Sequence, residues 1–450
     1  MKKLLAILLA FTLVLSLAGC SGNAAEGDSQ DVIELTLWTY PAGDWGDKAA
    51  VETLLTQFNS VYPNIHVTVQ CLDQTAADDT VSTAVDGGLA PDLLLAGPEQ
   101  LMKVWGAQGL LADLSDMWDD TDKAEINDVC QSACFTTDGK CYMYPLAMNV
   151  QCMAINYDAF VTAGADQYID LTTRTWTTEQ FIQAVKALYS KYGEPAAAVY
   201  CSGQNGDQGT RALVTNLYGG EFTNAAHTAY TVNSEANRQA LELLRSMDGV
   251  SFDDAINGEE EATLFYHEAL KISFCWSLSQ QLTPVVDEPE EEGADPVIHD
   301  AGKTVNGQTI EFMSFPSETG ESRLPGDIWG FGVFDNGDQT KIDAAKLLIR
   351  FFADGQGTSA SVRATGAFPV RSAADGVNLA NLWAGNDTMT EYGKLTGYMG
   401  DFYQLTPGWA TARTEWWNML QRVMDTDGSV DAILAEMTAA QDAANAAAAG

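Results

Sequence analysis

Basic residues are scarce in this 450-residue chain. Its 23 lysines and arginines face 62 acidic residues, which gives a formal net charge of −39. DNA, RNA and anionic membrane surfaces are themselves negatively charged, so binding to any of them through charge is excluded. The acidic residues are spread along the chain instead of forming one tail, and we interpret them as a solvated, soluble surface.

Recognised catalytic motifs are also missing. There is no GxSxG, HExxH or P-loop pattern, and no GxGxxG follows a strand. The histidines are scattered without metal-ligand spacing at His66, His227, His267 and His299. We therefore expect a protein that is not an enzyme and holds no cofactor or metal. A cell-surface glycoside hydrolase remains an alternative, because it needs only two carboxylates about 5–10 Å apart and aromatic side chains beside them.

Long apolar runs are missing beyond the first twenty residues. Lys2 and Lys3 precede a run from Leu4 to Leu17, and its 14 residues are too few for the about 20 that span a bilayer. We interpret residues 1–19 as a secretory signal peptide. The segment Leu17–Cys20 resembles the lipobox of bacterial lipoproteins, which implies lipidation of Cys20, and residues 20–31 read as a polar tether.

Seven cysteines remain after Cys20, and an odd number cannot all pair. Their spacing matches no zinc pattern, and a chain of this length does not need disulfides to fold. We expect Cys130 and Cys134 to be small buried apolar residues, and the sequence leaves open whether any bridge forms.

Alternating apolar residues at 32–39 and 65–69 and a short apolar run at 92–96 predict three strands, and the helical spacing between them predicts β-α-β-α-β order with a parallel sheet. Further on, Thr177 and Gln180 have the spacing of a capping box at the start of a helix. Helices are expected over 415–424 and 430–440, followed by a fraying alanine-rich tail. About 420 residues after the tether exceed what one core usually organises, so two lobes are expected.

Ordered short motifs carry a family resemblance. The sequence resembles the extracellular solute-binding proteins of carbohydrate importers, relatives in fold of maltose-binding protein. The resemblance covers nearly the whole mature chain and rests on the order of the following segments: 37–39, 58–65, 90–93, 139–145, 154–160, 175–177, 326–331 and 366–371.

The resemblance implies an α/β, two-lobed periplasmic-binding-protein-like fold with a hinge and a central ligand cleft. We expect one discontinuous lobe from 32–145 plus 268–325, and the other from 146–267 plus 326–450. It further implies a monomeric substrate-binding lipoprotein of an ABC transporter, anchored outside the cell membrane by its lipid. Such a protein closes on a carbohydrate and delivers it to a membrane permease.

A carbohydrate site needs aromatic rings that stack on the apolar C–H faces of the sugar, and planar polar groups that hydrogen-bond to its hydroxyls. Residues near strand ends and crossings are our candidates, although core packing or a solvated surface role is a comparable alternative for each. The aromatic candidates are Trp38, Tyr40, Trp276, Trp329 and Trp409, and the polar ones are Asp44, Glu99, Asn149, Asp327 and Arg371. The acidic candidates leave a polyamine or a peptide open as the cargo.

Overall fold

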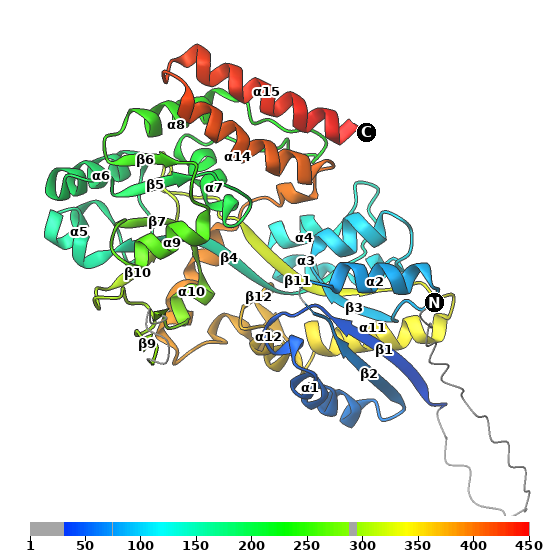
Figure 1. Cartoon of the computed structure of the whole chain (residues 1–450). Coiled ribbons are helices and arrows are strands. Elements are labelled where there is room, and N and C mark those ends of the chain that lie inside the picture. Colours follow the sequence, from blue (N-terminus) through cyan, green and yellow to red (C-terminus); the bar gives the residue numbers. More distant parts are fainter. Residues whose placement is uncertain (1–30, 74, 288–294, 450) are drawn as a thin grey trace, which may run out of the picture.

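The computed structural model describes residues 31–73, 75–287 and 295–449. The predicted signal peptide, Cys20 and nearly all of the tether lie outside this part of the chain. The described residues fold into two lobes joined by long strands (Figure 1). Within those ranges, no helix is both long and apolar enough to span a bilayer.

The first lobe is built on the predicted parallel strands. β1 (Ile33–Thr39) lies between β2 (Ile65–Cys71) and β3 (Leu93–Ala96), and both pairings are parallel. The lobe's other elements are η1 (Gly43–Gly46), α1 (Lys48–Val61), α2 (Ala77–Asp86), the π-helix η2 (Glu99–Gly106), η3 (Ser115–Met117), α3 (Asp120–Glu125), α4 (Asp128–Cys134), α11 (Gln339–Ala353), α12 (Thr358–Thr365), β12 (Phe368–Pro369), β13 (Ala373–Ala374), β14 (Val377–Asn378) and η5 (Leu379–Asn381).

The second lobe contains a pair of parallel strands, β5 (Ala197–Tyr200) and β6 (Val250–Asp253). The predicted capping box is present, because the Thr177 hydroxyl accepts a hydrogen bond from the Gln180 amide and the Gln180 side chain accepts one from the Thr177 amide. The remaining elements are α5 (Tyr157–Ala163), η4 (Asp166–Tyr168), α6 (Thr178–Tyr192), α7 (Asp207–Leu217), α8 (Glu235–Ser246), α9 (Gly258–Tyr266), β7 (Ile272–Ser277), α10 (Leu278–Leu282), β8 (Val286–Asp287), β9 (Val297–Ile298), β10 (Ile310–Met313), α14 (Trp409–Asp425) and α15 (Val430–Ala449).

Three segments cross between the lobes. β4 (Tyr144–Asn156) pairs through its first half with β11 (Gly326–Val333) and through its second half with β7 and β10. The chain enters β11 from the second lobe and pairs with β3 in the first. It returns through α13 (Asp387–Gly393), η6 (Lys394–Tyr398) and η7 (Tyr403–Leu405), where residues 398–400 hydrogen-bond to Leu324.

The expected lobe boundaries need a correction. Residues 268–325 were assigned to the first lobe, but their strands β7 and β10 pair with the second half of β4. Residues 326–450 were assigned to the second lobe, but β11 pairs with β3 and α11 packs on β1. Apolar periodicity identifies strands, whereas only pairing decides the sheet to which each strand belongs.

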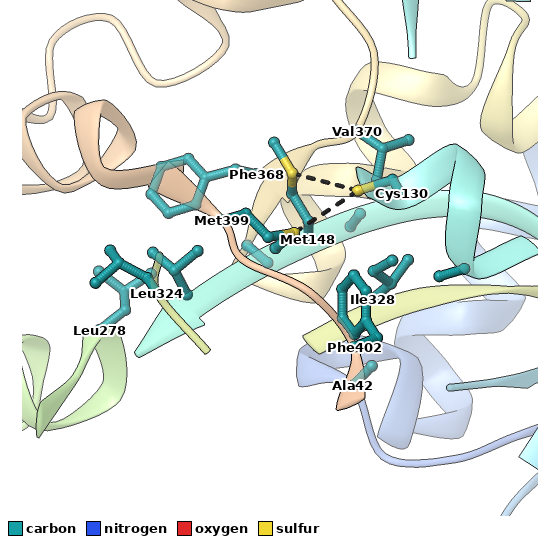
Figure 2. Close-up of a cluster of buried hydrophobic side chains, with 14 of the residues drawn as sticks. Ala42, Cys130, Met148, Leu278, Leu324, Ile328, Phe368, Val370, Met399 and Phe402 are labelled. Atoms are coloured by element: carbon teal, nitrogen blue, oxygen red, sulfur yellow. Dashed lines mark hydrogen bonds between the residues drawn. The ribbon is translucent and has the colours of Figure 1, made fainter. Parts of the chain in front are cut away.

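Buried side chains fill the region where the crossings meet. Met148 of β4, Ile328 of β11, and Met399 and Phe402 of the third crossing lie together in Figure 2. The sulfur of Cys130 lies 3.6 Å from the Met148 sulfur and 3.9 Å from that of Met399. Flexible thioethers pack well in such irregular space.

The cysteines behave as the sequence analysis expects. All seven in the described part of the chain are free, and five of them are buried: Cys130, Cys134, Cys141, Cys152 and Cys201. Burial raises the pKa of the Cys152 thiol to about 12, so this thiol stays protonated and unreactive at neutral pH.

Candidate ligand cleft

A polar cleft of about 230 Å³ lies between the lobes, bordered by both lobes and by the crossing strand β11. The first lobe contributes Glu99, β11 contributes Asp327, and the second lobe contributes Arg211, Trp409 and Arg413. η2 of the first lobe contacts η7 on the far side of the cleft. A ligand in this space would touch both lobes at once, as closure around a ligand requires.

The local folds place these groups at the carboxyl ends of strands. Glu99 follows β3 directly and begins η2, while Asp207 begins α7 shortly after β5. Ligands of open α/β sheets commonly bind beyond the carboxyl ends of the strands. Both lobes therefore present their strand ends to the same cleft.

One buried carboxylate organises two arginines on the second-lobe wall. Asp207, which is 1% exposed, lies 2.5 Å from Arg211 Nη1 through Oδ2 and 3.1 Å from Arg211 Nη2 through Oδ1. Arg413 donates to the same two oxygens at 2.8 and 2.9 Å. Such bidentate, charge-assisted pairs fix the planes of both guanidinium groups. We call Asp207, Arg211 and Arg413 the cleft cluster.

Aromatic rings stand beside the cleft cluster. The Arg211 guanidinium lies 4.9 Å from the ring centre of Trp409 and 5.5 Å from that of Tyr403. Trp409 is the first residue of α14, and the preceding Gly408 has φ +74°. A Cβ at Gly408 would also come within 2.7 Å of the Ala447 backbone, so glycine is required for both reasons.

The carboxylic acids in the cleft are partly desolvated. Burial raises the pKa of Glu99, and the nearby Asp78 charge raises it further, while Arg413 opposes both effects from the other lobe. Desolvation also raises the pKa of Asp327, although this residue keeps an exposed surface in the cleft. Both acids therefore hold a proton more readily than carboxylates on an open surface do. In the ionised form, each can accept a hydrogen bond from a ligand hydroxyl.

Several candidates from the sequence come together here. Glu99, Asp327 and Trp409 line the cleft. Asn149 pairs directly opposite Asp327 across β4 and β11, so the two side chains leave the same face of the sheet. Trp329 is two residues along β11 from Asp327 and shares its face, but it does not line the cleft itself.

Tyr40 lies behind this site. Its side chain is buried, and its hydroxyl donates a hydrogen bond to Asp78, whose charge acts on Glu99. Tyr40 therefore supports the first-lobe wall of the cleft, and its ring is not exposed for a ligand to stack on.

Two candidates lie elsewhere on the first lobe. Trp38 is partly buried and lines a separate depression with Leu89 and Lys341. Asp44 is exposed on η1, which packs against α12. Neither lines the cleft.

Two further candidates are structural residues. Trp276 is 1% exposed, packs against Phe265 and Tyr266, and donates through Nε1 to Gln281 at 3.0 Å. Trp276 therefore packs in the core, which was the alternative to ligand stacking, and Trp276→Ala should lower the free energy of unfolding by about 3–5 kcal/mol.

Arg371 is 3% exposed and pairs with Asp122 at 3.2 Å, with Glu125 at 2.8 Å and with Asp354 at 2.6 Å. These pairs hold the first lobe together, and Arg371 does not line the polar cleft but borders a different cavity. We call Asp122, Arg350 and Arg371 the core cluster, because Arg350 also pairs with Asp122 at 3.1 Å.

The sequence analysis missed the cleft cluster. Trp409 and Arg413 are four residues apart on one helix face, as are Asp207 and Arg211, and this spacing is visible in the sequence. It was overlooked because the last helix pair was expected to begin at 415, whereas α14 begins at Trp409.

A larger cavity of about 720 Å³ lies between the α3–α4 connection and α13. It shares no lining residue with the polar cleft and does not reach the carboxyl ends of the parallel strands. Among the described residues, no group of three or more metal-binding side chains is assembled. We therefore place the candidate site in the interlobe cleft, where aromatic faces and fixed hydrogen-bonding groups meet.

Comparison with solved structures supports the two-lobed architecture. The cyclic alpha-maltosyl-1,6-maltose binding protein from Arthrobacter globiformis matches with a TM-score of 0.72 and 19% identity, over 93% of this chain and 99% of its own. The sugar-binding protein MalE from Xanthomonas citri matches with a TM-score of 0.66 and 17% identity, over 92% and 97%. The Listeria monocytogenes substrate-binding protein Lmo0181, solved with cycloalternan, matches with a TM-score of 0.60 and 18% identity, over 92% and 99%.

A search of curated proteins found no match. The family model described as bacterial extracellular solute-binding protein matches residues 53–396, which is more than half of the chain. That span includes Glu99, Asn149 and Asp327 as well as two of the three crossings. The chain therefore belongs to the family of bacterial extracellular solute-binding proteins.

Proposed function

We propose that this protein is the substrate-binding lipoprotein of an ABC importer. It captures an extracellular carbohydrate, an oligosaccharide, for delivery to a membrane permease. The observation that carries the proposal is the cleft wall in which Trp409 and Tyr403 stand beside Arg211 and Arg413. Aromatic faces suit the C–H surfaces of sugars, and fixed guanidinium groups suit their hydroxyls.

The relatives in fold support the same class of ligand. The names of three of them refer to cyclic maltosyl-maltose, cycloalternan or sugar binding. The Arg211 and Arg413 guanidinium groups are oriented by Asp207, and Glu99, Asp327 and Asp401 also line the cleft. The acidic lining keeps a polyamine as the alternative cargo, and the aromatic rings of Trp409 and Tyr403 favour a carbohydrate.

The decisive experiment is a thermal-shift screen of the purified protein without its signal segment. It compares a panel of mono- and oligosaccharides with polyamines and short peptides at equal concentration. A ligand at 100 times its Kd stabilises the folded protein by about 2.7 kcal/mol, which raises the melting temperature measurably. Stabilisation by saccharides alone is the expected result, and stabilisation by only a polyamine or a peptide would overturn the carbohydrate assignment.

The proposal includes binding without catalysis. Incubation of the protein with each stabilising saccharide, followed by chromatography of the products, should show the sugar unchanged. Product release that disappears in the Glu99→Gln or Asp327→Asn variant would support the glycoside hydrolase alternative instead.

Anchoring and assembly complete the proposal. The lipobox resemblance supports acylation at Cys20 and a position on the outer face of the cell membrane. Mass spectrometry of the membrane-extracted protein should find the lipid on Cys20, and Cys20→Ala should release the protein from the membrane fraction. Light scattering of the soluble form should give the mass of a monomer, and a stable dimer would contradict that part.

A further inference from the structure

Each of the four histidines lies beside a carboxylate. The pairs are His66 with Glu34, His227 with Asp401, and both His267 and His299 with Asp287. Of these three carboxylates in the described part of the chain, only that of Asp401 lines the interlobe cleft. The pair of His227 and Asp401 therefore joins a titratable imidazole to the candidate ligand site.

The His227 imidazole contacts both ends of the segment 401–406. Its Nε2 lies 3.0 Å from Asp401 Oδ1, and its Nδ1 lies 3.2 Å from the Thr406 hydroxyl oxygen. The Phe402 amide donates a hydrogen bond to the same Asp401 oxygen at 2.9 Å. The Asp401 side chain is 46% exposed, so its carboxylate stays within reach of a ligand in the cleft. We call residues 401–406 the clamped segment.

The clamped segment forms part of the cleft wall. Asp401, Tyr403 and Gln404 all line the cleft. The ring centre of Tyr403 lies 5.5 Å from the Arg211 guanidinium. η7, in the middle of the segment, also contacts η2 of the first lobe, which begins with Glu99. A displacement of the clamped segment would therefore move both an aromatic ring of the cleft and a contact between the lobes.

The backbone of His227 is held in an unfavourable conformation. Its φ of +51° lies in the left-handed region, which residues other than glycine adopt uncommonly. The His227 amide donates to the Asn224 carbonyl at 3.0 Å, and the same loop reaches the clamped segment again where the Tyr230 hydroxyl donates to the Thr406 carbonyl at 3.1 Å. Strained backbone persists where surrounding contacts fix it, and it is frequent beside ligand sites. The loop therefore holds the imidazole against the clamped segment.

We propose that His227 is a positioning residue whose protonation tightens the clamped segment, so that the protein binds its ligand more strongly at mildly acidic than at mildly alkaline pH. Histidine is the side chain whose charge ordinarily changes between pH 5 and 8. His227 and Asp401 form an ion pair only while the imidazole is protonated. Because a ligand needs the cleft wall in place, the form with the ion pair binds it better. This inference rests on the proposed function and adds a regulation to it.

Other charged groups surround Asp401 and enter any pH profile. Six of them line the cleft or the pocket of about 290 Å³ that shares Asp401 with it: Glu99, Arg211, Glu221, Arg323, Asp327 and Arg413. The arginines keep their charge at all relevant pH values. Burial raises the pKa of Glu99 and of Asp327, so these two acids can also take up protons as pH falls. The effect of His227 must therefore be measured with variants that leave these groups in place.

Calorimetry at pH 6.0 and pH 8.0 tests the proposal, with the hexasaccharides of the α-1,4-glucan, β-1,4-glucan, β-1,4-mannan and β-1,4-xylan series as probes. The parent protein should bind the saccharide that it recognises about threefold more tightly at pH 6.0, because a charge-assisted contact is stronger than a neutral one and the exposure of Asp401 limits the gain. His227→Asn should bind equally at both pH values, since asparagine tolerates the left-handed conformation and does not titrate. Equal affinity of the parent at both pH values would overturn the proposal.

A matched control and a second variant assign the effect. His66→Asn is the control, because His66 also contacts a carboxylate, that of Glu34 at 3.1 Å, but lies on β2 and not in the cleft. It should keep the pH dependence of the parent protein. Asp401→Asn removes the other partner of His227 and should lose the pH dependence as His227→Asn does. A pH dependence that survives in both of these variants belongs to the other acids of the cleft and would contradict the proposal.

Hydrogen exchange of the ligand-free protein tests the positioning role without any saccharide. At pH 6.0 the amides of the clamped segment should exchange more slowly in the parent protein than in His227→Asn, and at pH 8.0 this difference should be smaller. A difference that is absent at pH 6.0, or equal at both pH values, would overturn the proposal even if a saccharide binds. If the expected exchange is seen and none of the four saccharides binds, the failure lies with the proposed cargo and not with His227.

Discussion

Two clusters of the molecule share one chemistry and differ in their surroundings. In the core cluster, Asp122 binds Arg350 and Arg371, and in the cleft cluster, Asp207 binds Arg211 and Arg413. Asp122 and Asp207 are each 1% exposed. The core cluster is completed by Tyr144, which donates to Asp122 at 2.7 Å. The cleft cluster instead adjoins Trp409, Tyr403 and open space. Each cluster has one buried arginine and one partly exposed arginine, so the difference lies in their neighbours. The core cluster is tied to further groups of the first lobe, whereas the cleft cluster stands beside aromatic rings of the interlobe cleft.

The largest expected effect is on the core cluster. Asp122→Ala leaves Arg371 and Arg350 without their shared carboxylate, so the free energy of unfolding should fall by about 3–5 kcal/mol, as it does when a buried ion pair loses one partner. Urea denaturation measures this change. Asp116→Ala, which removes an exposed partner of Lys346, is the control and should cost less than about 1 kcal/mol. A loss that small in Asp122→Ala would show that the core cluster is not structural.

The next effect is on ligand affinity. Trp409→Ala removes an aromatic face from the cleft and the ring beside Arg211, so saccharide affinity should fall about 30-fold, or about 2 kcal/mol. Isothermal titration calorimetry measures it. Trp383→Ala is the matched control, since Trp383 also lies beside an arginine, Arg363, but outside the cleft. Equal affinity losses in both variants would indicate a general loss of structure and remove Trp409 from the site.

A substitution of Arg413 tests most directly whether the cleft cluster has a different role from the core cluster. Arg413→Gln should reduce saccharide affinity about tenfold, which corresponds to about 1.4 kcal/mol. The fold should survive, because Arg211 still pairs with Asp207. Arg422→Gln on the same helix is the control, since Arg422 pairs with Glu436 away from the cleft. If Arg413→Gln instead unfolds the protein without a specific loss of affinity, the cleft cluster is structural like the core cluster.

The smallest effect concerns pH. The raised pKa of Glu99 means that the folded protein holds this proton more tightly than the unfolded chain does. Stability therefore falls as pH rises from the ordinary glutamate pKa to the raised one. Glu99→Gln should remove that fall and raise the melting temperature at pH 7 by the equivalent of less than about 1 kcal/mol, because water still reaches the carboxyl group. At pH 3.5 the Glu99 side chain is neutral in both the folded and the unfolded chain. The Glu99→Gln variant and the parent protein should therefore melt at the same temperature, and a difference that persists there would contradict the assignment of the pH effect to Glu99.

The sequence predicted the elements better than their assembly. β1 and β2 were predicted by local alternation, β3 by a short apolar run, and the Thr177 capping box by spacing alone. The lobe assignment of 268–325 was wrong because β7 and β10 choose β4 through pairings that local patterns do not contain. Distant pairings must be read from the folded structure.

The site shows the same limit. Glu99 and Asp327 were identified because strand ends and crossings are visible in the sequence, and both line the cleft. Trp276 and Arg371 have the same local signals, but their neighbours in space bury them. A tryptophan or an arginine can bind a ligand only if part of its side chain faces open space. The order of residues in the sequence does not reveal this.

The position of α15 has a consequence for how the protein is made. Asn445 of α15 hydrogen-bonds to Tyr230 in both directions, and Gly408 fits against the backbone of Ala447 directly before Trp409. The expectation that the alanine-rich segment frays is therefore wrong. Because α15 follows every other described element, the wall that carries Trp409 has no complete support until the chain through residue 447 is free to fold. The protein would thus acquire its ligand-binding ability in one late step and not lobe by lobe.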